Sequence, residues 1–209
     1  MPVSLNVTRR ALLLGGLLSH ALMLPPGITL ASSGPKVATL DWALLETLLK
    51  IGANVVAAPE LRQFREVVIE PSVPRPVADL GLRGLPNLET LFFSKPDIIF
   101  NSNFYTWADP LLSNIAPTHQ LNIYVQGQSP FELAQAAAIQ MGEMLNLSTQ
   151  SSAYVHGVND QIEQKRQKFR DLGVRKFLLI NIGDARHYRV FGEDSIFGAM
   201  LKRLGFENA

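Results

Sequence analysis

Residues 78–89 have the sequence ADLGLRGLPNLE, which sets Arg83 between Gly81 and Gly84. The two glycines leave the backbone permissive around this single cation. Pro86 follows at a point where a helix can begin. The stretch therefore predicts an arginine loop that leads directly into a helix.

A second loop follows a short distance along the chain. The turn at residues 95–97, Lys-Pro-Asp, leads into the apolar segment 98–100, and the chain emerges at residues 101–105. The arginine loop and this aromatic loop both lie at predicted strand edges, where α/β proteins tend to bind ligands. The pattern favours a binding cleft over a catalytic centre.

Strand and helix patterns alternate on both sides of these loops. We expect strands at 37–40, 55–58, 97–100 and 121–125, helices at 41–51, 87–93, 109–115 and 129–145, and an irregular, proline-rich segment at 59–77. This alternation predicts an α/β fold with a mainly parallel sheet.

A long polar segment, residues 148–172, contains no proline and predicts one helix that ends at Gly173. A strand at 176–182 and a helix at 195–204 then begin a second α/β unit. Because a sheet of one or two strands is marginally stable by itself, we expect a truncated protein that binds its ligand weakly or not at all.

Composition excludes several functions. The formal net charge is +1, and no basic stripe interleaved with aromatic residues predicts a nucleic-acid partner. Cysteine is absent, which excludes disulfides and thiolate metal sites. The mature region lacks a nucleophile elbow, a phosphate loop and a dinucleotide glycine pattern, and His119, His156 and His187 are dispersed. The sequence predicts neither an enzyme nor a metal centre.

The N-terminus has the order of an export signal. Arg9 and Arg10 precede an apolar run at 11–24, and a small-residue site with cleavage after Ala31 follows. The run is shorter than the roughly 20 residues of a membrane-spanning helix, the alternative interpretation. The arginine pair also resembles a twin-arginine signal. We expect a cleaved signal peptide and a periplasmic protein.

These features together resemble one family. They are residues 37–42, the arginine loop 79–83 with residues 86–89, the turn 95–97, the long helix, and residues 186–192. The chain resembles the periplasmic binding proteins that deliver iron(III)-hydroxamate siderophores, such as ferrichrome, to an inner-membrane ABC permease.

The resemblance implies a two-lobe α/β fold with a long connecting helix and an incomplete second lobe. The implied divisions are a signal peptide at 1–31, an N-terminal lobe at 36–147, a connecting helix at 148–173, and the start of a C-terminal lobe at 174–209. It also implies a monomer whose ligand is a ferric siderophore, with no cofactor. A binding protein for another chelate, such as cobalamin or haem, is the alternative.

The resemblance further implies roles for individual residues. Arg83 and Tyr105 would donate hydrogen bonds to the hydroxamate oxygens, since the chelate already saturates the iron. Aromatic walls would come from Trp42, Phe104 and Trp107, although Trp42 fits the core at a strand end equally well. Asp109 is near the position of an acidic residue that docks on the permease.

Two residues depart from the pattern of such proteins. Val67 and Asn101 stand at positions where an aromatic residue is expected. The sequence therefore predicts a binding wall that is more polar or more open.

Overall fold

A computed structural model describes residues 34–173 and 176–209. The expected signal peptide, residues 1–31, lies outside the described residues. Among the described residues, no helix combines the length and the apolar character needed to cross a membrane.

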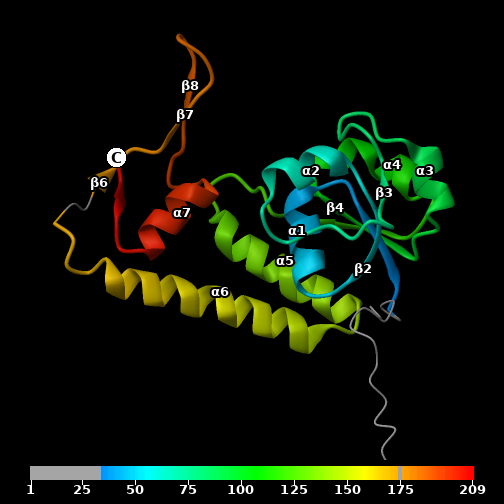
Figure 1. The fold of residues 1–209 in the computed structure, drawn as a ribbon, viewed down its shortest axis with the longest axis horizontal. Coiled ribbons are helices and arrows are strands. Elements are labelled where there is room, and N and C mark those ends of the chain that lie inside the picture. Colours follow the sequence, from blue (N-terminus) through cyan, green and yellow to red (C-terminus); the bar gives the residue numbers. More distant parts are fainter. Residues whose placement is uncertain (1–33, 174–175) are drawn as a thin grey trace, which may run out of the picture. The chain divides into compact units, whose positions relative to one another are not determined.

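A five-stranded parallel sheet forms the centre of the first part of the chain (Figure 1). Its strand order is β3-β2-β1-β4-β5. The strands are β1 (Lys36–Thr39), β2 (Asn54–Ala58), β3 (Ala78–Asp79), β4 (Ile98–Ser102) and β5 (Thr118–Leu121). The predicted α/β fold with a parallel sheet is confirmed.

Helices connect and follow these strands. They are α1 (Trp42–Lys50), α2 (Leu61–Val67), α3 (Leu88–Phe93), the 3₁₀ helix η1 (Asn103–Ala108), α4 (Asp109–Leu112), α5 (Pro130–Met144) and α6 (Ser148–Lys168). The remaining elements are β6 (Lys176–Phe177), β7 (Ile180–Ile182), β8 (Tyr188–Val190), α7 (Ile196–Arg203) and β9 (Glu207–Asn208).

The sheet is buried on both faces, as a parallel sheet with helical crossovers requires. Successive residues of one strand point to opposite faces. Val37 of β1 packs in the cluster that holds the buried leucines of α1 and Met141 of α5. Ala38, its neighbour, packs in a second cluster with Leu91 of α3 and Leu112 of α4. Successive residues of β1 therefore contribute to two different cores.

Polar residues at the helix starts fix the loops that leave the sheet. Asp41 caps α1 by accepting from the backbone N–H of Ala43 at 2.7 Å. Asn87 caps α3 by accepting from the N–H of Thr90 at 2.8 Å. Each cap satisfies a backbone donor that a helix start leaves without an intrahelical partner.

The structure corrects four sequence predictions. The segment 59–77 is not wholly irregular, because α2 forms within it. The last strand of the sheet, β5, begins and ends earlier than the predicted 121–125. The long helix ends at Lys168 rather than at Gly173. The predicted strand 176–182 is divided into β6 and β7, which belong to two different two-stranded sheets.

The long helix α6 packs closely on α5. A β-carbon added to Gly142 of α5 would come within 2.4 Å of the β-carbon of Ser151, so only glycine fits at this approach. Farther along, Phe131 of α5, Ile162 of α6 and Ala199 of α7 share a small buried cluster. These contacts tie the last helix to the pair α5 and α6.

Two neighbouring residues of α3 provide a test of the core cluster that contains Ala38 and Leu112. Leu91 is fully buried, whereas the next residue, Phe92, is 59% exposed. We expect Leu91→Ala to lower the free energy of unfolding by about 2–5 kcal/mol, the usual loss for a buried leucine. The matched control Phe92→Ala should change it by about 0.5 kcal/mol or less. Urea unfolding measures both, and equal losses would contradict the core assignment.

Candidate functional site

One side chain follows each strand of the parallel sheet at its carboxyl end. They are Trp42 after β1, Glu60 after β2, Arg83 after β3, Tyr105 after β4 and Tyr124 after β5. Because parallel strands all end at the same edge, five segments far apart in sequence meet there. The strand order also reverses between β1 and β4, and ligands of open α/β sheets bind outside such a point.

Arg83 is held by both oxygens of one carboxylate. Glu60 Oε1 accepts from the backbone N–H of Arg83 at 3.0 Å. Glu60 Oε2 accepts from Arg83 Nε at 2.7 Å. The side chains of Arg83 and Glu60 are 34% and 15% exposed. The arginine that the sequence singled out is therefore fixed at its backbone and at its guanidinium.

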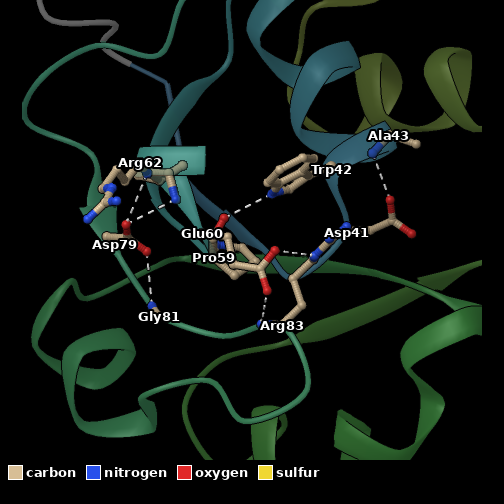
Figure 2. Close-up of polar contacts among 10 residues, drawn as sticks. Asp41, Trp42, Ala43, Pro59, Glu60, Arg62, Asp79, Gly81 and Arg83 are labelled. Atoms are coloured by element: carbon tan, nitrogen blue, oxygen red, sulfur yellow. Dashed lines mark hydrogen bonds and ion pairs between the residues drawn. The ribbon is translucent and has the colours of Figure 1, made fainter. Parts of the chain in front are cut away.

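A second carboxylate fixes the loop on which Arg83 lies (Figure 2). Asp79 Oδ1 accepts from the N–H of Gly81 at 3.0 Å, while Oδ2 accepts from the N–H of Leu61 at 3.0 Å. Gly81 adopts a φ of +72°, in the left-handed region that glycine tolerates without strain. Its carbonyl accepts from the N–H of Glu60 at 2.8 Å. The arginine loop is thereby joined to the start of α2.

Trp42 packs against the core and also contacts Arg83. Its ring packs edge-on against Phe64 at a centroid distance of 5.2 Å, at the border of the core. The guanidinium of Arg83 lies over the same ring, with its Cζ 4.3 Å from the ring centroid. Trp42 Nε1 donates to the carbonyl of Pro59 at 3.0 Å (Figure 2). The tryptophan is thus both a core residue and the platform for Arg83.

Tyr105 lies near Arg83 but is largely buried. The residue is only 9% exposed and packs in the core with Leu91 and Leu112. The guanidinium of Arg83 is close enough to act on the phenol electrostatically. Burial raises the pKa of Tyr105, and the nearby Arg83 opposes part of that rise. The phenol therefore keeps its proton at neutral pH.

Phe104 and Tyr124 extend the site with exposed aromatic surface. Their ring centroids lie 5.8 Å apart, and Phe104 also packs against Tyr105 at 5.1 Å. Partial burial and the negative charge of Asp41 raise the pKa of Tyr124 to about 12. Phe104 was predicted from the sequence, whereas Tyr124 was missed because it fell inside the predicted strand 121–125. The observed strand ends before it, at Leu121.

A buried pair connects the arginine side of the site to the aromatic loop. Ser102, the last residue of β4, donates to Asp41 Oδ2 at 2.5 Å. Its hydroxyl also accepts from the N–H of Phe104 at 3.3 Å. Both members of the pair are almost completely buried. The start of α1 and the start of η1 are therefore fixed relative to each other.

Two of the predicted site residues lie apart from this cluster. Trp107 is 49% exposed and, within the described part of the chain, makes no ring contact with the other site aromatics. Asp109 begins α4, and its Oδ1 accepts from Asn101 Nδ2 at 2.6 Å. The structure brings Arg83, Trp42, Tyr105 and Phe104 together, and leaves Trp107 and Asp109 outside their contacts.

The expectation that Asn101 forms part of the binding wall is wrong. Asn101 is fully buried in β4, where its Nδ2 also donates to the carbonyl of Tyr105 at 2.9 Å. It supports the aromatic loop from inside the fold instead of facing a ligand. Val67, in contrast, is exposed at the end of α2.

This arrangement supplies hydrogen-bond donors and aromatic surface. The guanidinium retains N–H groups beyond the Nε–H used by Glu60, since arginine carries five donors. Among residues 34–173 and 176–209, no three His, Asp or Glu side chains gather in a way that would hold a metal ion. The described residues of the site therefore offer hydrogen-bond donors beside aromatic surface.

Comparison with known proteins gives a consistent result. A family model described as periplasmic binding protein matches residues 37–209. The iron(3+)-hydroxamate-binding protein FhuD of Escherichia coli is 32% identical over 204 residues, which cover 97% of this chain and 69% of that protein. The ferric-anguibactin-binding protein FatB of Vibrio anguillarum is 23% identical, and the match covers 88% of this chain and 57% of that protein.

A solved structure agrees with the fold. The siderophore-binding protein FhuD from Vibrio cholerae, in a crystal structure with Fe³⁺-Desferal bound, matches with a TM-score of 0.78 at 23% identity. The match covers 83% of this chain and 66% of that one. The chain thus spans about two thirds of the length of these two FhuD proteins.

The tyrosines of the site predict a distinctive alkaline titration. Because the pKa of Tyr124 is raised from 10.0 to about 12, the folded protein keeps this proton between those pH values while the unfolded chain loses it. Stability should therefore fall as pH rises through this window. Ultraviolet absorbance should show a phenolate component near pH 12 that Tyr124→Phe removes. The control Tyr188→Phe, on exposed β8, should leave that component in place. Loss of the component in the control would contradict its assignment to Tyr124.

Proposed function

This chain belongs to the periplasmic binding protein family, and we propose that it captures iron(III)-hydroxamate siderophores and delivers them to an inner-membrane ABC permease. The proposal extends to the chain what the names of its relatives in Escherichia coli and Vibrio cholerae say of those proteins. These relatives are named as binding proteins, which supports the expectation that the chain is not an enzyme.

One observation carries this proposal: Arg83 is fixed against Trp42 at the carboxyl edge of the sheet, beside exposed aromatic rings. A wrapped ferric ion needs no protein ligand, because the chelate fills its coordination shell. It offers oxygens with partial negative charge, and a planar guanidinium can donate to them. The hydrocarbon part of the chelate would lie on the aromatic surface.

Arg83 is the proposed principal donor to the hydroxamate oxygens. Tyr105 can add its phenol proton, although its burial leaves little of its surface for a ligand. Trp42 and Phe104 would form the wall, and Trp107 would contact only a ligand large enough to reach beyond them. The ligand itself is cargo, so the proposal includes no resident cofactor.

The organisation of the chain is proposed on the same grounds. Residues 36–147 would form the N-terminal lobe, 148–173 the connecting segment that contains α6, and 174–209 part of a C-terminal lobe. Residues 1–31 would act as an export signal, which agrees with the periplasmic location that gives the family its name. The short sheets formed by β6 with β9 and by β7 with β8 support a separate unit after α6.

Titration of the purified chain with ferrichrome, carried to ligand concentrations that detect weak binding, tests the function. Trp42 should report binding by fluorescence quenching that saturates with ferrichrome and is weaker with the iron-free siderophore. Cobalamin and haem serve as competing ligands in the same assay. Tight binding of either one with no response to ferric hydroxamates would contradict the proposal and favour another chelate.

Replacement of the central cation should weaken this binding. Arg83→Ala should raise the dissociation constant for ferrichrome about 10- to 100-fold, because hydrogen bonds to a charged group contribute about 1.5–3 kcal/mol each. Arg62→Ala is the matched control, since Arg62 lies nearby on α2 with its side chain 91% exposed. An unchanged constant in Arg83→Ala would remove this residue from the site.

Asp109 is retained as the proposed permease contact. Its Oδ1 is engaged by Asn101, which would orient the carboxylate and leave Oδ2 available to a basic partner. Asp109→Asn should leave the ferrichrome titration unchanged within about twofold while lowering the ATPase stimulation of the cognate reconstituted permease. Full stimulation by this variant would argue against the docking role.

A further inference from the structure

We propose that Glu60 is a positioning and specificity-determining residue of this site. It fixes the orientation of Arg83 and offsets its charge, so that the site prefers ferric complexes without net charge over anionic ones. This inference rests on the proposed function, because it concerns which ferric chelates the same site accepts.

The side chain of Glu60 is committed to Arg83 rather than to its own helix. Glu60 occupies the N-cap position of α2, yet its side chain makes no capping hydrogen bond. Asp79 takes that role instead, by accepting from the N–H groups of Leu61 and Arg62 at 3.0 and 3.4 Å. The carboxylate of Glu60 is consequently available for its two hydrogen bonds with Arg83.

Glu60 is itself held in place, as a positioning residue must be. Its backbone adopts a φ of 52°, in the left-handed region. A residue other than glycine adopts this conformation only when its surroundings impose it. Its N–H donates to Gly81 in the arginine loop, and its neighbour Pro59 accepts from Trp42. Glu60, Arg83, Trp42 and Pro59 thus close a ring of contacts.

The ring leaves the guanidinium with donors but little excess charge. The Nε of Arg83 lies 2.7 Å from a glutamate oxygen. Asp41 and Asp79 add two more carboxylates behind this edge, each bound by backbone N–H groups. Arg83 is the one cation among the five described side chains that follow the strand ends. An anionic ligand would therefore find no unpaired positive charge among these five side chains.

Ferric chelates differ in their net charge, the property to which such a site responds. Three singly charged hydroxamates neutralise iron(III), as in ferrichrome. Three doubly charged catecholates leave the complex strongly anionic. An unpaired arginine attracts anions over several ångströms, whereas a paired one retains mainly its short-range hydrogen bonds. Glu60 should therefore have a large effect on the ratio between the affinities for neutral and anionic complexes. Its effect on the affinity for the neutral complex alone should be smaller.

Glu60→Gln separates charge from shape. Glutamine keeps the β-carbon, so the backbone strain at φ 52° is unchanged. Its amide oxygen can still accept from the backbone N–H of Arg83. Wild type and variant are titrated with ferrichrome and with a synthetic ferric tris-catecholate. We expect the variant to shift the affinity ratio at least 10-fold toward the catecholate. The matched control Glu66→Gln removes one carboxylate from an exposed ion pair on the same helix and should shift it less than twofold.

A ligand-free measurement tests the positioning role. In nitrogen-15 NMR spectra, the Nε–H signal of Arg83, identified by its loss in Arg83→Lys, should be protected from exchange in wild type and in Glu66→Gln. It should lose protection in Glu60→Gln. An unchanged Nε–H signal in that variant would overturn the positioning role.

The outcomes also separate this inference from the function on which it rests. Wild type that binds ferrichrome, with an affinity ratio unchanged in Glu60→Gln, overturns the specificity role alone. Wild type that binds no ferric hydroxamate overturns the proposed function, and the specificity role with it. If Glu60→Gln does not fold, a salt series on wild type decides, because an unpaired Arg83 would lose catecholate affinity with rising ionic strength and a paired one would not.

Discussion

Every strand of the main sheet runs in the same direction, and this constraint creates the site. Parallel pairing brings the five carboxyl ends to one edge, so that Trp42, Glu60, Arg83, Tyr105 and Tyr124 meet although they are spread over more than eighty residues of sequence. The same pairing requires helical crossovers, and these bury both faces of the sheet. The functional edge and the two cores are consequences of one topology.

Within this edge, the guanidinium of Arg83 is ordered before any ligand arrives. It is bound at Nε by Glu60 and stacked on Trp42. A free arginine side chain would lose roughly 2 kcal/mol of rotamer entropy when it becomes fixed. Part of that entropy is lost on folding, so less is lost when a ligand binds. Preorganisation of this kind improves affinity without adding a contact to the ligand.

The sequence predicted the features that local chemistry determines. Glycines beside Arg83 and the cap at Asn87 identify the arginine loop and its helix, and alternating apolar segments identify the parallel sheet. It missed Glu60 because prolines made the segment 59–77 look irregular. No local sequence pattern identifies Arg83, twenty-three residues away, as the partner of this carboxylate. Tyr124 was lost through a strand boundary placed too late, since strand ends are set by pairing between distant residues, here β4 with β5.

The aromatic residues of the site differ in how deeply they are buried. Tyr105 lies almost wholly in the core, where it packs against Phe104 and keeps a protonated phenol near Arg83. Phe104 and Tyr124 carry the exposed rings, and Asp41 with Ser102 fixes the loop that presents Phe104. An open aromatic surface with one ordered donor group gives little specificity for a small ion. Under the proposed function, such a surface would suit a bulky ligand whose apolar body covers the rings while its oxygens face the guanidinium.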